Sequence, residues 1–398
     1  MVTNKHKDVI SFILFFLGWF IYYNQVILGL RGWYSQIILA VMMVWSFLCY
    51  QRVMNKGGYN PVLKALNYLL IMYVLYGLLQ LMLISKLSVE SFEYIKKSML
   101  SLVPIFGYYY YVRRLSIGEG WMIIIIIGML LSAIGEYFGS QIELAERIQT
   151  GSMANRDTSE FVIGASYRFL PILPMLSFVK RNVWIKYVSL LVILAFVVLS
   201  LKRGPILICG LCMVIFLFDS LKQSGKKIKF THIIIASVAI VAGIYIITYI
   251  INSNDFLLFR IEQMLEGDSS NRDSIYKELY QHFINENDIF KYLFGNGANS
   301  TLIIAGIYAH NDWLQLALDQ GLLGVLIYLF YYIQFFRQRK PSKPNHELYM
   351  SIGMFILISL ISSMISMSIN NYRLTGHFCI AYCLAMADLY SLKKKRLV

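Results

Sequence analysis

Residues 121–139 read WMIIIIIGMLLSAIGEYFG, and Glu136 is the one charged residue among them. This run is long enough to cross the hydrocarbon core of a bilayer as a single α-helix. Comparable apolar runs recur along the whole chain of 398 residues, of which 58% are hydrophobic and 15% charged. A transmembrane barrel would instead show segments of about ten residues with alternating polarity. The sequence therefore predicts an all-α, polytopic membrane protein.

About twelve spans are predicted, and together with their connectors they form one transmembrane domain over residues 1–398. The first apolar run follows Lys5 and Lys7, as in a signal peptide, but it is too long for one and lacks a clear cleavage site. We therefore expect it to be retained as a span. The predicted spans lie at about 9–30, 36–54, 66–84, 98–112, 121–139, 161–179, 184–200, 205–221, 232–252, 313–336, 348–369 and 376–391.

The charge distribution predicts the orientation of these spans. With the N-terminus in the cytoplasm, most of the 36 Lys and Arg residues fall on the inner side and most of the 22 Asp and Glu residues on the outer side. Lys and Arg concentrate in short cytoplasmic loops. We therefore expect both termini in the cytoplasm. The net charge of +14 then fits an anionic inner leaflet and does not indicate a nucleic-acid partner.

The inner connectors are too short for a cytosolic catalytic domain; the stretch 51–65 is among the longest. The chain also lacks a Gly-rich phosphate loop of the GxxxxGK[ST] kind. The five cysteines lie in apolar runs, and no cluster of His, Cys, Asp or Glu has metal-ligand spacing. We expect no cofactor and no metal. Any chemistry should occur on the outer face, with a substrate that already stores the energy.

Residues 253–312 form the largest connector, which the topology places outside the cytoplasm as a large helical loop. The stretch 256–266 has one apolar face, which is typical of an interfacial helix. The stretch 270–273 fits a capping box that begins a second helix. Residues 295–297, Gly-Asn-Gly, predict a turn. The loop ends at His310, where the chain re-enters the membrane.

Two arginines of the outer face are candidate anion ligands. Arg272 is expected in the first turn of its helix, where free backbone N–H groups and a guanidinium together bind anions; it could equally be a solvated side chain beside Asp268 or Asp273. Arg203 lies in a short outer turn, where Lys and Arg are disfavoured. Arg203 therefore calls for a negative partner, unless it extends to lipid headgroups.

Arg168 falls inside the predicted span 161–179, roughly 10 Å below the outer surface at helical rise. An unpaired charge at that depth costs several kcal/mol. Arg168 should therefore either serve function or form an ion pair. Glu136, at a comparable depth in its own span, is the expected partner.

His310 is one of six histidines and is a candidate general base, because a neutral imidazole takes up a proton near neutral pH. Asn311 or Asp312 could orient its ring, and either of them could cap the span that follows. The alternative is a capping or interfacial histidine. Asp319, Arg373 and His377 are weaker candidates on the same side.

Two stretches together resemble the O-antigen polymerase and O-antigen ligase superfamily of bacterial membrane glycosyltransferases. The first is Arg203-Gly204 at the outer end of a span. The second is His310-Asn311-Asp312-Trp313-Leu314 followed by Gly321-Leu322-Leu323-Gly324, after the large outer loop. Ser270-Asn271-Arg272 adds to the likeness. The similarity covers about residues 160–340.

The resemblance implies transfer of a glycan from an undecaprenyl-pyrophosphate carrier to an acceptor hydroxyl outside the cytoplasm. Arg203 and Arg272 match arginines that hold the pyrophosphate, and His310 matches the histidine that activates the acceptor. Arg168 matches no family position, so its assignment to the pyrophosphate depends on the cost of its burial. Guanidinium groups would stabilise the charge on the departing pyrophosphate.

The sequence thus predicts a polysaccharide polymerase of the bacterial inner (cytoplasmic) membrane. It would join lipid-linked repeat units into O-antigen, capsule or exopolysaccharide. Its partners would be the undecaprenyl-pyrophosphate-linked oligosaccharide, the growing glycan acceptor, the lipid bilayer and, as a candidate, a chain-length regulator. The alternatives are an O-antigen ligase that uses a lipid A-core acceptor and a transporter or flippase for lipid-linked sugars. The absence of internal repeats disfavours the transporter.

Overall fold

The computed structural model describes residues 2–55, 60–83, 89–149, 164–200, 202–223 and 272–396. Over these residues all regular secondary structure is helical, which confirms the predicted class. The α-helices are α1 (Val2–Tyr23), α2 (Trp33–Met54), α3 (Pro61–Leu83), α4 (Val89–Leu115), α5 (Glu119–Gln149), α6 (Ile172–Met175), α7 (Val183–Leu199), α8 (Arg203–Gln223), α11 (Arg272–Ile284), α12 (Ile289–Phe294), α13 (Ser300–Ala305), α14 (Asp312–Arg339), α15 (His346–Ile365) and α16 (Leu374–Arg396). Three short 3-10 helices are η2 (Gly164–Arg168), η3 (Leu176–Phe178) and η4 (Ile369–Asn371).

Five of the helices, α2, α3, α5, α14 and α15, are long and apolar enough to cross a membrane, and α7 and α8 contain shorter apolar helices. The chain is therefore a multi-pass membrane protein. The predicted number of about twelve spans is not confirmed. The predicted span 232–252 lies outside the described residues.

The span predicted at 161–179 is wrong as a continuous helix. Residues 164–178 fold instead into η2, the four-residue helix α6, and η3. Pro171 and Pro174 explain the break, because proline has no N–H for the helical hydrogen bond and its ring clashes with the preceding turn. The break keeps Arg168 at the end of a short 3-10 helix rather than on the side of a long one.

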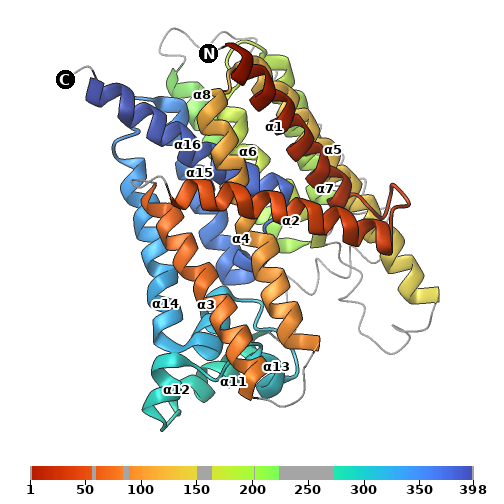
Figure 1. Ribbon diagram of the computed structural model, residues 1–398, viewed down its shortest axis with the longest axis vertical. Helices are drawn as coiled ribbons and strands as arrows, with labels where there is room; N and C mark the ends of the chain where they lie inside the picture. The colour runs from red at the N-terminus through yellow and green to blue at the C-terminus, as the bar shows by residue number, and fades with distance from the viewer. Residues whose placement is uncertain are drawn as a thin grey trace.

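Figure 1 shows both termini at one end of the molecule and the short helices α11, α12 and α13 at the opposite end. Helix α4 lies in the middle, packed against α2, α3 and α16. Its four consecutive tyrosines, residues 108–111, are all buried. Aromatic rings from α1 pack against them; the Phe15 and Tyr108 ring centroids are 5.0 Å apart. Tyr108 also contacts Phe378 of α16, with ring centroids 5.8 Å apart, so this packing links the N-terminal helices to the C-terminal one.

Helix α14 has a break at Gly321, whose φ of 66° and ψ of −162° are not helical. The break leaves the carbonyls of Leu318 and Asp319 to accept hydrogen bonds from the backbone N–H groups of Asn296 and Gly297, at 2.7 and 3.1 Å. A side chain at Gly321 would lie 2.5 Å from the backbone of Leu293. Glycine is therefore required here both for its conformation and for the close approach. The predicted turn at 295–297 thus joins the segment after α12 to α14.

Candidate functional site

A cavity of about 380 Å³ lies where the loop end at His310 meets η2, the turn before α8, α15 and the segment 366–376. We call it the His310 cavity. Its lining includes four cationic side chains besides the histidine: Lys97, Arg168, Lys202 and Arg373. These residues come from separate parts of the sequence, so the fold gathers charges that the sequence spreads over almost 280 positions. A positively charged cavity suits an anionic ligand.

His310 lies at the cavity wall in a backbone conformation that is uncommon for a residue with a side chain. Its φ is 48°, in the left-handed region. Its carbonyl accepts a hydrogen bond from the Tyr276 hydroxyl at 3.1 Å. Helix α14 starts two residues later, because the Asn311 side chain accepts hydrogen bonds from the N–H groups of Trp313 and Leu314 at 2.9 and 3.2 Å. The predicted cap by Asn311 is confirmed.

A buried polar network holds the segment on which His310 lies. The Asp319 carboxylate accepts from the N–H and hydroxyl of Ser300 at 2.9 and 2.8 Å, and from the Gln315 amide at 2.8 Å. The Gln315 carbonyl in turn accepts from Thr301 at 2.9 Å and from the backbone N–H of Ala309 at 3.3 Å. The network ties α13 and residue 309 to α14. Asp319 thus serves to position this segment.

The side chain of Asp312 contacts a tyrosine of α14 and the segment after α15. Its buried carboxylate accepts hydrogen bonds from the Tyr328 hydroxyl at 2.8 Å and from the N–H groups of Ser368 and Ile369 at 3.0 Å. The side-chain hydrogen bonds of Asn311 likewise go to the start of α14 and to the Met364 carbonyl. Both residues therefore position backbone segments around the cavity.

Arg272 is the first residue of α11, as expected, and lies beside the cavity. Its guanidinium donates to the Ile365 carbonyl at 3.0 Å. Burial, together with the positive charges of Arg272 and Arg168, lowers the pKa of Lys202 to about 8. Dehydration at the wall, with the charges of Arg272 and Lys202, lowers the pKa of His310 below its usual 6.5. His310 is therefore neutral at pH 7, in a field that favours a bound anion.

Arg203 begins α8 and follows Lys202 directly, but it is not part of the cavity lining. The glycine after it explains the local packing. A methyl group at Gly204 would lie 2.5 Å from the Tyr167 hydroxyl and 2.7 Å from the Ile365 side chain. Glycine thus lets the start of α8 approach η2 and the end of α15. The Arg-Gly pair brings Lys202 to the cavity and places Arg203 next to it.

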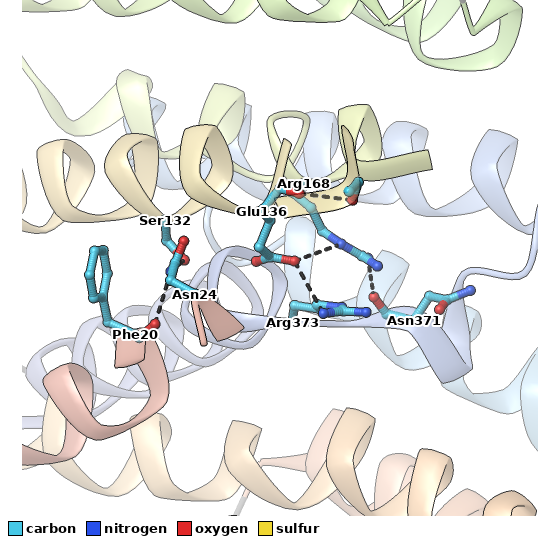
Figure 2. Close-up of polar contacts among 8 residues, drawn as sticks. Phe20, Asn24, Ser132, Glu136, Arg168, Asn371 and Arg373 are labelled. Carbon is cyan, nitrogen blue, oxygen red and sulfur yellow. Dashed lines mark hydrogen bonds and ion pairs between the residues drawn. The ribbon is translucent and has the colours of Figure 1, made fainter. Parts of the chain in front are cut away.

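Arg168 forms the ion pair expected from the sequence. Its Nε lies 3.3 Å from the Glu136 carboxylate, and Arg373 approaches the same oxygen at 3.4 Å. Figure 2 shows the carboxylate between the two guanidinium groups, with Arg168 also donating to the Asn371 carbonyl. The sequence ranked Arg373 as a weak candidate and did not single out Lys202 on its own. A basic pair in a very short outer turn was the signal for Lys202.

Several sequence predictions lie outside the described residues: the interfacial helix at 256–266 and Ser270-Asn271 of the capping box. Among the residues that the structure does describe, no three His, Cys, Asp or Glu side chains come close enough to hold a metal ion. The five cysteines are buried as free thiols. His377 is buried against Trp19 and Tyr23 and is not part of the lining of the His310 cavity.

A comparison with protein families matches residues 188–329 to the O-antigen ligase family. The match contains Arg203, Arg272 and His310, whereas Glu136, Arg168 and Arg373 lie outside it. A search of curated proteins finds no similar sequence. The matched segment supplies the histidine and two of the arginines around the cavity described above. The resemblance inferred from the motifs is confirmed over residues 188–329, the segment that matches the O-antigen ligase family of membrane enzymes in polysaccharide biosynthesis.

Proposed function

We propose that this protein is a polysaccharide polymerase that joins undecaprenyl-pyrophosphate-linked oligosaccharide units outside the cytoplasm. The observation that carries the proposal is the His310 cavity, in which one neutral imidazole lies among cations from four separate segments. A general base and an anion site in one cavity are the two requirements for glycosyl transfer from a pyrophosphate donor. The product would be O-antigen, capsule or exopolysaccharide.

The pyrophosphate of the donor would bind where the positive charges converge. Lys202 and Arg168 line this part of the cavity, and Arg272 lies beside it. Arg203 is adjacent to Lys202 and would extend the same basic surface. Burial first, and then the charges of Arg272 and Arg168, lower the pKa of Lys202. A bound pyrophosphate would stabilise the charged form of Lys202.

The reaction would be a single displacement. The acceptor hydroxyl oxygen attacks the anomeric carbon of the donor sugar and forms the new glycosidic bond. The bond between that carbon and the pyrophosphate oxygen breaks, and undecaprenyl pyrophosphate leaves with the electron pair. His310 takes the proton from the acceptor hydroxyl, while the cations stabilise the charge on the leaving group. Neither ATP nor a cofactor is needed for this balance.

The proposed orientation places both termini in the cytoplasm and residues 253–312 outside it, within one transmembrane domain of residues 1–398 and about twelve spans in the bacterial inner membrane. Two features support it. The C-terminal Lys393-Lys394-Lys395-Arg396 and the N-terminus lie at one end of the molecule, and α11–α13 lie at the other (Figure 1). Basic residues favour the cytoplasmic side. A chain-length regulator in the same membrane is a candidate partner.

A ligase that transfers the glycan to a lipid A-core acceptor is the second candidate, and the description of the matched family favours it. Both reactions use the same donor and the same cavity chemistry. They differ in the acceptor alone. The polymerase uses a second lipid-linked unit, and the ligase uses a lipopolysaccharide core.

The proposal is tested with purified full-length protein and synthetic undecaprenyl-pyrophosphate repeat units. A polymerase converts them into a ladder of longer lipid-linked glycans and releases undecaprenyl pyrophosphate. Addition of lipid A-core should then leave the ladder unchanged. A single addition onto lipid A-core without a ladder would favour the ligase. Recovery of all donor unchanged in the presence of both acceptors would refute glycosyl transfer.

A further inference from the structure

A second cavity, of about 470 Å³, lies next to the His310 cavity. The two share part of their lining: Lys97, Gly164, Arg168, Asn371, Tyr372 and Arg373. The second cavity extends from this shared wall to α1, the segment 24–26 and α5. Its size falls within the roughly 300–1,000 Å³ of small-ligand sites. We call it the α1–α5 cavity.

Three polar atoms of its lining residues have no hydrogen-bond partner among the described residues: the Tyr23 hydroxyl, Asn24 Oδ1 and Glu136 Oε1. All three residues are more than nine-tenths buried. A buried polar atom without a partner costs free energy. Such atoms call for a ligand that supplies hydrogen-bond donors.

The orientation of Asn24 is fixed by its other contacts. Its Nδ2 donates to the Phe20 carbonyl at 2.8 Å and to the Ser132 hydroxyl at 3.0 Å (Figure 2). A carbonyl oxygen can only accept, so the amide cannot be turned round. Oδ1 therefore faces Gly135, the residue before Glu136. A methyl group at Gly135 would lie 1.8 Å from this oxygen, so glycine is required for the segment 24–26 to lie against α5.

The two carboxylate oxygens of Glu136 also differ in their contacts. One carboxylate oxygen holds Arg168 and Arg373 at the shared wall, and the other has no partner among the described residues. Glu143, two turns further along α5, adds a second carboxylate to the lining. The two carboxylates offset most of the charge of Lys97, Arg168 and Arg373 in the same lining, so a neutral polar ligand fits this cavity better than pyrophosphate. The polar lining does not fit an acyl chain. Acceptor oxygens beside Tyr22 and Tyr23 suit sugar hydroxyls and the apolar face of a pyranose ring.

We propose that the α1–α5 cavity is a binding subsite for neutral, hydroxyl-rich glycan residues. Sugar hydroxyls donate to Glu136 Oε1 and pair with the Tyr23 hydroxyl. A glycan whose reacting end lies near His310 passes the wall of Arg168 and Arg373 to reach this subsite. The inference rests on the proposed function. It assigns the sugars of the substrate, rather than its pyrophosphate, to residues outside the matched family segment.

The test measures binding of a lipid-free oligosaccharide of two repeat units, cut from the polysaccharide of the source bacterium. It is titrated into the full-length protein in nanodiscs, and the Kd is measured by calorimetry. Tyr23→Phe removes one unpartnered hydroxyl and should raise the Kd about two- to tenfold, the effect of one hydrogen bond. Tyr108→Phe is the matched control: its hydroxyl is also buried without a partner in the described residues, but lies outside the cavity.

A second pair of variants does not depend on a buried residue. Gln25→Ala in the cavity lining should weaken binding, whereas Gln36→Ala, exposed on α2, should leave the Kd unchanged. No binding to the wild-type protein would overturn the proposal. So would equal effects of the Tyr23 and Tyr108 variants together with an unchanged Kd in Gln25→Ala.

Failure of this inference and failure of the proposed function can be told apart. The oligosaccharide carries no pyrophosphate, so its binding should persist in His310→Ala, in which transfer should be lost. If the protein forms a normal ladder but its binding of the oligosaccharide does not change in the cavity variants, the subsite is overturned and the proposed function is not. Competition between the oligosaccharide and the synthetic lipid-linked repeat unit shows whether the subsite binds the sugars of the donor or those of the acceptor. Displacement assigns the subsite to donor sugars, and simultaneous binding assigns it to the acceptor chain.

Discussion

The Glu136 carboxylate binds Arg168 at 3.3 Å and Arg373 at 3.4 Å through the same oxygen. The Glu136 side chain is 4% exposed and that of Arg168 13%. One carboxylate thus holds two guanidinium groups of the shared wall between the two cavities. Because it comes from α5 and the arginines come from η2 and the segment after η4, it also joins three elements that are distant in sequence.

Glu136→Gln should strongly destabilise the protein. It leaves the buried guanidinium of Arg168 without its counter-charge, and loss of one partner of a buried pair costs about 3–5 kcal/mol. The midpoint of thermal unfolding in detergent measures the effect. Glu146→Gln is the control, because Glu146 pairs with Arg31 at the exposed surface and such pairs contribute about 0–1 kcal/mol. Equal shifts of the midpoint in the two variants would contradict the structural role of Glu136.

The rate of transfer should depend on pH with a maximum between the pKa values of His310 and Lys202. The acid limb arises because protonated His310 cannot accept a proton. The pKa of His310 lies below 6.5, so the rate should rise with pH where the imidazole loses its proton, below pH 6.5. The alkaline limb arises because Lys202 loses its charge near pH 8 and anion binding weakens. The quantity to measure is kcat/KM, which reports on the free enzyme. Lys202→Arg should shift the alkaline limb upward, since arginine stays charged.

An alkaline limb that is unchanged in Lys202→Arg would remove Lys202 from the pyrophosphate site. An acid limb that persists in a His310 variant with residual activity would likewise assign that limb to another group.

Gly204→Ala should reduce transfer at least tenfold. The added methyl group would collide with the Tyr167 hydroxyl and the Ile365 side chain, and so displace η2 and the start of α8 from each other. Gly210→Ala in the same helix is the matched control, because nothing lies within 4 Å of the added methyl group. Initial rates of undecaprenyl pyrophosphate release provide the measurement. Full activity of Gly204→Ala would show that the close approach is not needed.

Asp312→Asn should loosen the segment 366–372. The asparagine NH₂ group cannot accept the hydrogen bonds that the carboxylate receives from Ser368 and Ile369, and a buried unsatisfied donor costs about 1–3 kcal/mol. Amide hydrogen exchange should become faster in this segment, while exchange in α12 stays as in the wild type. If exchange in residues 366–372 is unchanged, the carboxylate does not hold this segment.

The sequence predicted the helical class, the membrane spans of α2, α3, α5, α14 and α15, and the Arg168–Glu136 pair. Each depends on a strong local rule: apolar length for the spans, and the cost of an unpaired charge for the pair. The cap at Asn311 follows in the same way from its position before an apolar helix.

Other features could not be predicted because they depend on contacts between distant segments. The span at 161–179 was wrong because its apolar composition concealed the effect of Pro171 and Pro174. The hydrogen bond that the Asp312 carboxylate accepts from the Ser368 N–H depends on where the segment after α15 lies. The Lys202 and Arg373 contributions to the cavity, and the α1–α5 cavity itself, likewise require the packed arrangement of the helices.

The central claim is that His310 and Arg272 act together on a lipid-pyrophosphate donor at one cavity. It is tested most directly by the initial rate of undecaprenyl pyrophosphate release from the synthetic repeat unit, in His310→Ala and Arg272→Ala. His282→Ala and Lys277→Ala, exposed on α11, serve as matched controls. The account predicts a rate at least a hundredfold lower in the first two variants, at the scale of a lost general base or oxyanion ligand, and unchanged rates in the controls. Wild-type rates in His310→Ala and Arg272→Ala would contradict it.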